Sequence, residues 1–270
     1  MNYWTQSKDN IFVAAHRGWS ELYPENTIIA FEKALEIGVD QLETDIHVTK
    51  DGHLVLIHDG TVDRTTNKTG NVCDYTLEQL KKLDAGGWKS EAFRGTQIPT
   101  FIEFMELVKD HPTITLDIEL KEYPEIDEER AYYACDETLK LIDQYGFTDR
   151  VVINSWSPRL NEYVFLKYGK KYRQHVYWPP HCMTTECEID PYSYGYCVCL
   201  FSFNGVKGSR GIGTKENCEE MIARGCRPWA PTYVTNNWRV DKAIEAGFEL
   251  ITCNNPDHIL ALLREKGKHK

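Results

Sequence analysis

Residues 41–48, with the sequence QLETDIHV, are followed by the turn Lys50-Asp51-Gly52 and by a second apolar run from His53 to His58. Apolar and polar side chains alternate in the first run, which predicts a β-strand. A short turn with glycine between two strand-like runs predicts a β-hairpin. This stretch therefore predicts a sheet strand with a hairpin partner, and the rest of the fold is inferred outward from it.

Strand-like segments alternate with helical patterns on both sides of this hairpin. The segment Pro24-Glu25-Asn26-Thr27 has the proline and polar cap of a helix start, and Gly38 is placed to end that helix. The other expected strands are Ile11–Ala15, Thr113–Leu120, Arg150–Asn154, Gln174–Tyr177, Tyr196–Phe203, Arg227–Ala230 and Leu250–Cys253. Strands that alternate with helices form parallel sheets. Eight such strands with one side hairpin predict an α/β fold of the (β/α)₈ TIM-barrel type.

A doubly wound sheet is the competing α/β architecture. No glycine fingerprint of the G-x-G-x-x-G type follows the first strand, which disfavours that fold and nucleotide binding. Residues 60 to about 100 break the alternation, because they are polar, rich in turns and hold one short expected helix, Leu77–Leu83. We interpret residues 1–270 as a single barrel domain with a small insertion at about 60–100, after the second strand.

Charge and hydropathy narrow the classes of partner. The chain has 31 basic and 41 acidic residues, a net charge of −10, which disfavours nucleic acid as a partner. A phosphate substrate remains compatible, since a bound cation can reverse the local field. No apolar run approaches the roughly 20 residues of a membrane helix, and residues 1–10 are polar without a signal core. We therefore expect a cytoplasmic protein without an integral membrane segment.

The nine cysteines form no CxxC pair, and the spacing of a zinc site is missing. We expect reduced thiols in a reducing compartment.

Two of the expected interior strands carry carboxylates on one face. Because strand side chains alternate with period two, Glu43, Asp45 and His47 share one face, as do Asp117, Glu119 and Lys121. Internal salt bridges are the alternative use of such groups. Carboxylates buried in a barrel need a cation, hydrogen-bond donors or a proton. Hard oxygen ligands at this density favour one divalent cation, Mg²⁺ or Ca²⁺.

Two histidines stand at expected strand ends. His16 is followed by Arg17 and Gly18, and His58 by Asp59. Imidazoles exchange protons near neutral pH, which hydrolysis of a phosphodiester requires at both the nucleophile and the leaving alkoxide. Arg17 and Lys121 would stabilise negative charge on a phosphate. Active sites of such barrels lie at the carboxyl ends of the strands, where these residues fall.

The chain resembles the glycerophosphodiester phosphodiesterase family over an ordered set of motifs. The motifs are His16-Arg17-Gly18, Pro24-Glu25-Asn26-Thr27, Glu43-Thr44-Asp45, Thr49-Lys50-Asp51-Gly52, His58-Asp59, Asp63-Arg64-Thr65-Thr66, Leu83-Asp84-Ala85-Gly86, Ile98-Pro99-Thr100 and Ile118-Glu119-Leu120-Lys121. The resemblance implies a (β/α)₈ barrel with a small insertion. It also implies hydrolysis of small-molecule glycerophosphodiesters to glycerol 3-phosphate and an alcohol.

The resemblance implies roles for eight residues. They are His16 and His58 as the general acid/base pair, Arg17 and Lys121 as phosphate contacts, Glu43, Asp45 and Glu119 as cation ligands, and Trp229 as a wall of the substrate site. From sequence, Trp229 is equally compatible with a core aromatic. Asn26 is equally compatible with a functional role and with helix capping.

The second half of the chain resembles the family less closely. The last strand ends Thr252-Cys253-Asn254-Asn255-Pro256, where the family has Thr-Asp followed shortly by Pro. This departure leaves the specificity for the alcohol open. The competing functions are a lysophospholipase D-like phosphodiesterase of the same barrel group and a non-catalytic barrel that binds a phosphate ligand.

Overall fold

The computed structural model describes Trp4 and residues 10–203 and 210–270. The expectation for the polar start of the chain, residues 1–10, falls almost entirely outside this range.

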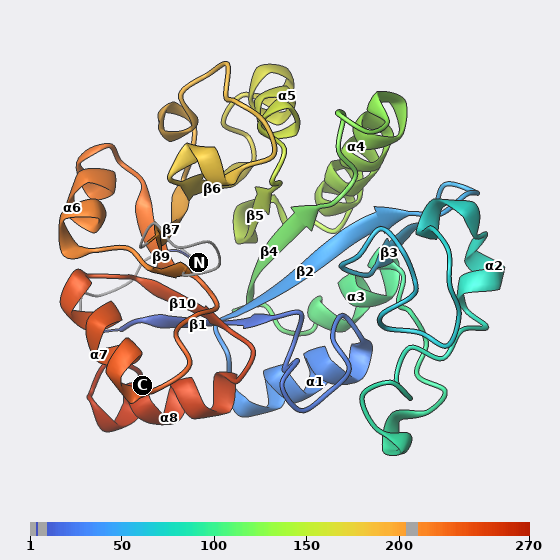
Figure 1. Ribbon diagram of the computed structural model, residues 1–270, viewed down its shortest axis with the longest axis horizontal. Coiled ribbons are helices and arrows are strands. Elements are labelled where there is room, and N and C mark those ends of the chain that lie inside the picture. The colour runs from blue at the N-terminus through green and yellow to red at the C-terminus, as the bar shows by residue number, and fades with distance from the viewer. Residues whose placement is uncertain (1–3, 5–9, 204–209) are drawn as a thin grey trace.

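Eight parallel strands close into a barrel (Figure 1). They are β1 (Phe12–His16), β2 (Gln41–Val48), β4 (Thr115–Leu120), β5 (Val151–Asn154), β6 (Arg173–Trp178), β7 (Cys197–Phe203), β9 (Arg227–Ala230) and β10 (Leu250–Cys253). The strands follow one another around the barrel in chain order, and β1 pairs with both β10 and β2, which closes the sheet. The predicted TIM-barrel fold is confirmed.

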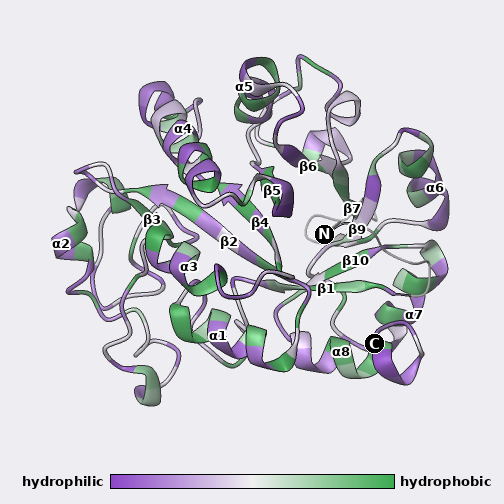
Figure 2. Ribbon diagram, turned by 180° about the vertical axis from the view of Figure 1, so that it is seen from behind, coloured by the Kyte–Doolittle hydropathy of each residue, from purple (hydrophilic) through white to green (hydrophobic). Residues whose placement is uncertain are grey.

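Helices surround the strands, and their apolar faces build the core (Figure 1). They are α1 (Ile28–Ile37), α3 (Phe101–Val108), α4 (Glu128–Gln144), α5 (Pro158–Tyr168), α6 (Lys215–Ala223), α7 (Asn237–Ala246) and α8 (Pro256–Glu265). Hydrophobic and hydrophilic stretches alternate along these elements, as Figure 2 shows for β2 and the outer helices. The core therefore lies between the barrel and the helix ring, where apolar strand and helix faces meet.

The first helix illustrates how local sequence sets its ends. The Thr27 side chain accepts a hydrogen bond from the amide of Ala30, which caps the helix at its start. Gly38 adopts the left-handed conformation at the other end, with φ 84°, and its N–H bonds back to the last turn. The helix predicted from Thr27 to Gly38 is confirmed, with Thr27 rather than Asn26 as its cap.

The hairpin and the following segment depart from the alternation of strand and helix. The strand β3 (Leu54–Leu56) pairs antiparallel with β2, as predicted, but is shorter than the expected run. Residues 60–100 contain η1 (Val72–Asp74), α2 (Leu77–Leu80) and η2 (Glu91–Phe93), and they lie beside the barrel, to the right in Figure 1. A small apolar cluster of their own, which includes Val62, Val72 and Leu80, packs against β3.

Short elements occupy the loops of the second half. They are η3 (Thr148–Arg150), η4 (Pro180–Cys182), η5 (Pro191–Ser193) and β8 (Arg210–Ile212). The sequence did not predict β8, which pairs antiparallel with β7. Residues 179–195 form no α-helix, as expected.

The barrel interior is apolar at its amino-terminal end. Trp4 fills this end and stacks on Trp229, with ring centroids 6.4 Å apart. Ala14, Val152, Cys197 and Leu250 are the other buried members of this cluster. The polar interior positions are thereby concentrated toward the carboxyl ends of the strands.

All nine cysteines are free thiols, and six of them are buried. In the described part of the chain, no helix is long and apolar enough to cross a membrane.

Candidate active site

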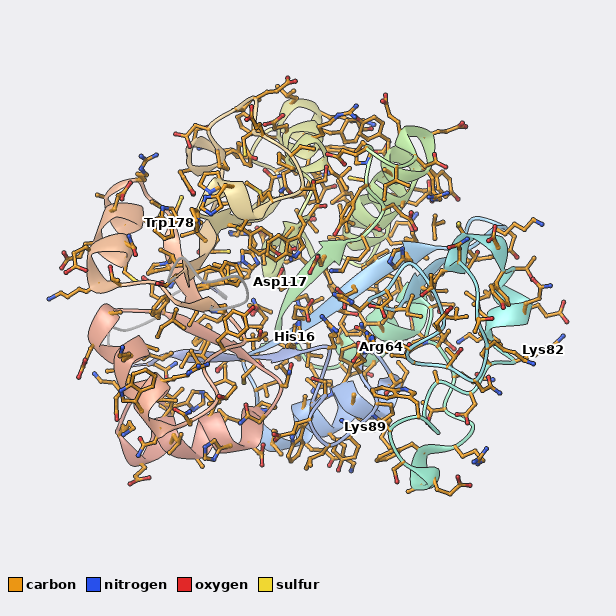
Figure 3. The ribbon with its side chains drawn as sticks, in the orientation of Figure 1. His16, Arg64, Lys82, Lys89, Asp117 and Trp178 are labelled. Atoms are coloured by element: carbon orange, nitrogen blue, oxygen red, sulfur yellow. The ribbon has the colours of Figure 1, made fainter. Side chains whose placement is uncertain are left out.

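A pocket of about 190 Å³ opens at the carboxyl ends of the barrel strands. One half of its lining carries the charged side chains and comes from β1, β2, β4, the hairpin and the turns that follow them. The other half is largely aromatic and comes from β5 to β9 and the loops that follow them. Figure 3 places His16 and Asp117 near the centre of the ring of strands, where this pocket lies.

Three buried carboxylates meet in the charged half. Glu43 and Asp45 lie on β2, and Glu119 lies on β4 directly opposite Asp45 in the strand register. One oxygen from each carboxylate lies within 4.8 Å of the others. Burial and the neighbouring Asp45 charge raise the pKa of Glu43 well above its usual value, and burial also raises the pKa of Glu119.

This cluster fits a divalent cation. Oε1 of Glu43 is buried and has no hydrogen-bond partner among the described residues, so it is available as an acceptor. Three oxygen donors of this kind match the ligand preference of Mg²⁺ and Ca²⁺. Glu43, Asp45 and Glu119 are therefore the residues that would hold the ion.

Two cationic side chains border the carboxylates. Nζ of Lys121 lies 3.2 Å from Oδ1 of Asp45 and also contacts Glu119. Nε of Arg17 lies 3.3 Å from Oδ2 of Asp45, and its Nη1 bonds to Glu25 at 2.9 Å. Burial would raise the pKa of Asp45, but the charges of Lys121 and Arg17 outweigh it and hold this pKa well below the usual value. Both cations face the pocket and are placed to contact an anionic ligand.

His16 and His58 lie on the same pocket with their Nδ1 atoms engaged. Nδ1 of His16 lies 2.6 Å from Oδ1 of Asn254, and Nδ1 of His58 lies 2.6 Å from Oδ1 of Asp59. Because both partner oxygens accept, each Nδ1 carries the proton and each neutral ring keeps a lone pair on Nε2. Burial and the Arg17 charge lower the pKa of His16 to about 4. Burial and the charges of Lys121 and Arg17 also lower the pKa of His58, against the opposing effect of Asp45.

Asn26 positions one of the carboxylates. Its Nδ2 donates to Oδ2 of Asp45 at 2.7 Å, and its Oδ1 accepts from the Thr44 hydroxyl at 2.8 Å. Its backbone has φ 54°, a left-handed conformation that asparagine tolerates better than most residues. Asn26 therefore supports the acidic cluster and does not cap the helix.

The turn after β1 is tightly fixed. Arg17 and Gly18 both have positive φ, 60° and 77°. A Cβ atom on Gly18 would lie 2.7 Å from the carbonyl carbon of Ala30 and 2.8 Å from its oxygen. The close approach to α1 explains why glycine follows His16 and Arg17.

We expect Gly18→Ala to destabilise the protein more than Gly38→Ala. Each substitution forces alanine into a left-handed conformation, at about 1–2 kcal/mol. Only Gly18 adds a backbone clash, since the nearest atom to a Cβ on Gly38 lies 3.9 Å away. Equilibrium unfolding in urea measures both losses, and equal losses would contradict the proposed packing.

Trp229 and His47, both singled out from the sequence, do not line the pocket, and neither do the buried Asp45 and Asn26. Trp229 is 2% exposed and packs between Trp4 and His175 in the barrel interior, so it takes the core position rather than that of a pocket wall. Trp229 faces the barrel interior from β9, but it lies toward the amino-terminal end of the barrel, whereas the pocket opens at the carboxyl ends of the strands. His47 shares a face with Glu43, but its Nδ1 bonds to Glu122 at 2.8 Å beyond the pocket.

Sequence reasoning missed several residues of the site. Asn154 and His175 line the pocket beside Tyr177, one of the aromatic residues of the second half for which the sequence left a pocket wall possible, and Asn254 holds His16. The period-two rule would have placed His175 and Tyr177 on one face of their strand. No local pattern marks Asn254, whose contact with His16 spans 238 residues.

The fold and pocket define a TIM-barrel protein with a carboxylate cluster, two cationic side chains and two histidines at the carboxyl ends of the barrel strands. Residues 16–174, more than half of the chain, match the model of the glycerophosphoryl diester phosphodiesterase family. A glycerophosphodiester phosphodiesterase of Caldanaerobacter subterraneus is 38% identical over 264 residues, which cover 94% of this chain and 98% of that protein. Human glycerophosphodiester phosphodiesterase 1 is 43% identical over 114 residues, which cover 41% of this chain and 34% of that protein.

Solved structures agree on the fold. A phosphodiesterase of Oleispira antarctica, in complex with the product sn-glycerol-3-phosphate, has a TM-score of 0.77 at 20% identity and covers 94% of this chain and 96% of its own. The chain belongs to the glycerophosphoryl diester phosphodiesterase family. It is an enzyme, a phosphoric diester hydrolase.

Proposed function

We propose that this enzyme hydrolyses glycerophosphodiesters to glycerol 3-phosphate and an alcohol, with one divalent cation and with His16 and His58 exchanging the protons. The observation that carries the proposal is that both histidines line one pocket together with Glu43 and Glu119, which form the carboxylate cluster with the buried Asp45. The name of the relative that matches almost the whole chain supports the same reaction class.

The charged half of the pocket suits a phosphodiester. Arg17 and Lys121 lie at the rim of the carboxylate cluster, and Arg17 is fixed by Glu25 as well as by Asp45. When bound, the cation would offset negative charge on the phosphate oxygens. Arg17 and Lys121 bind and orient the same group, so that the charge that develops during hydrolysis meets fixed positive groups.

The two histidines supply proton transfer. The lowered pKa of His16 keeps its ring neutral at pH 7, and Asn254 leaves the Nε2 lone pair free to accept a proton. Asp59 holds the His58 ring by its Nδ1 in the same way, and Arg64 in turn holds Asp59 at 2.7 Å. Two imidazoles fixed on one pocket allow one to take the proton of the nucleophile and the other to protonate the departing alcohol.

The first test is release of glycerol 3-phosphate from glycerophosphocholine by the purified protein. It is run with Mg²⁺, with Ca²⁺ and with excess chelator. We expect release with at least one cation and its loss with the chelator. Cation-independent release would contradict the metal assignment.

The same assay on lysophosphatidylcholine separates the competing substrate. Release of choline from that lipid alone would favour the lysophospholipase D-like reaction. Hydrolysis of neither compound, together with binding of glycerol 3-phosphate, would favour a non-catalytic barrel.

A further inference from the structure

A buried histidine of the pocket takes no part in the reaction scheme above. His175 lies on β6, is 5% exposed and lines the pocket. Its Nδ1 lies 2.8 Å from Oδ2 of Asp117, whereas its buried Nε2 has no hydrogen-bond partner among the described residues. Buried polar atoms in native proteins are nearly always paired. The unpaired nitrogen therefore indicates a ligand that bonds to it.

A hydrogen-bond network fixes the His175 ring. Oδ1 of Asp117 accepts from Nδ2 of Asn154 at 2.6 Å, and Oδ1 of Asn154 accepts from the Tyr177 hydroxyl at 2.8 Å. A carboxylate only accepts, so this contact selects the tautomer of His175 with its proton on Nδ1, in which Nε2 is an acceptor. The rings of Tyr177 and Trp229 pack on His175, each with its centroid 5.0 Å away. These contacts hold both the tautomer and the direction of the ring.

A ligand of the acceptor Nε2 of His175 must present a hydrogen-bond donor. A phosphate oxygen is itself an acceptor and is matched by Arg17 and Lys121 in the charged half of the pocket. A hydroxyl can donate, and it is the group that a glycerol moiety presents. Because His175 is buried whereas Trp156 and Tyr233 of the lining are partly exposed, a hydroxyl at His175 belongs to the most deeply inserted part of the substrate.

All glycerophosphodiesters contain the same glycerol moiety, whereas the alcohol varies from one to another. The variable alcohol needs the open side of the pocket, and the glycerol moiety is therefore the part that reaches the buried side. We propose that Nε2 of His175 accepts a hydrogen bond from the terminal hydroxyl of the glycerol moiety, and that Asp117 positions the ring for this bond. The assignment rests on the proposed function. It makes His175 a specificity-determining residue, because a substrate whose terminal oxygen is acylated or missing has no donor to offer.

Two substrates test this contact without any change to the protein. Glycerophosphocholine carries the terminal hydroxyl, and 2-hydroxypropyl phosphocholine lacks only that group. Both release choline, which gives a common readout. Sites built to bond a substrate hydroxyl discriminate strongly against the analogue without it. We expect the wild-type kcat/KM for glycerophosphocholine to exceed that for the analogue by at least about 10- to 100-fold.

A matched pair of variants assigns the discrimination to His175. In His175→Asn the amide nitrogen stands near the place of Nδ1 and can still donate to Asp117, but the acceptor toward the pocket is gone. In His175→Gln the longer side chain returns a polar group to the place of Nε2. We expect the ratio of kcat/KM between the two substrates to fall toward unity in His175→Asn and to recover in part in His175→Gln.

His47→Asn is the control, because His47 also pairs with a buried carboxylate, that of Glu122 just after β4, but lies outside this pocket. Its substrate ratio should equal that of the wild type. Equal loss on both substrates in His175→Asn would assign a structural role and overturn the proposal, as would a wild-type enzyme that does not discriminate. Failure of the wild type to hydrolyse either compound would instead contradict the proposed function.

Discussion

Replacing His16 or His58 with alanine is expected to reduce kcat for glycerophosphocholine by about 10² to 10⁴-fold, the usual contribution of a general acid or base. Each ring is held by its Nδ1, His16 by Asn254 and His58 by Asp59, and each leaves Nε2 for proton transfer. Removal of either ring takes away one of the two transfers, so the second histidine cannot compensate. Steady-state release of glycerol 3-phosphate measures the loss.

The control for this pair is His53→Ala. His53 lies in the hairpin turn, its side chain is 53% exposed, and its loop is held by a backbone bond to Thr49 that alanine retains. Activity close to wild type is expected for this variant. Near-normal turnover in His16→Ala or His58→Ala would remove that residue from the catalytic pair.

Replacing Glu43 with glutamine is expected to weaken binding of the divalent cation at least 10- to 100-fold, the loss known for groups that only support metal ligands. Glutamine keeps the volume of the side chain but removes the negative charge and one of the oxygens that meet Asp45 and Glu119. Isothermal titration of the protein with Mg²⁺ or Ca²⁺ measures the affinity directly. The readout does not depend on turnover.

Glu122→Gln is the matched control. Glu122 is also a buried carboxylate near the ends of β2 and β4, but its oxygens bond to His47 and Arg130 and not to the cluster. The cation affinity of this variant should be unchanged. An unchanged affinity in Glu43→Gln would show that the ion binds elsewhere or that Glu43 is not a ligand.

Local patterns in the sequence were sufficient to predict the strands and the residues that face the barrel interior. Period two along β2 and β4 depends only on backbone geometry, so Glu43, Asp45 and Glu119 were assigned to interior faces before any pairing was known. The alternation of strands and helices was sufficient for the parallel barrel. The short strand β8 was missed because three residues, Arg210–Ile212, are too few to establish a periodic pattern.

These local patterns do not predict which segments far apart in the chain come into contact. The register that sets Asp45 opposite Glu119 skips β3 and joins β2 directly to β4. Trp229 faces the barrel interior whether it is a core aromatic or a pocket wall. Only its position along the barrel axis, against Trp4, distinguishes the core role from a pocket wall.

By itself, the sequence determined the barrel, the polar faces of its strands and the residue types of the site, since these follow from local periodicity and side-chain chemistry. Only the tertiary structure decided which of these groups meet. Closure of the sheet brings Asn254 to His16, and the neighbouring strands β4, β5 and β6 bring Asp117, Asn154 and His175 together. The physical reason is that hydrogen-bond partners within a barrel are set by strand order and register, which join residues far apart in the chain.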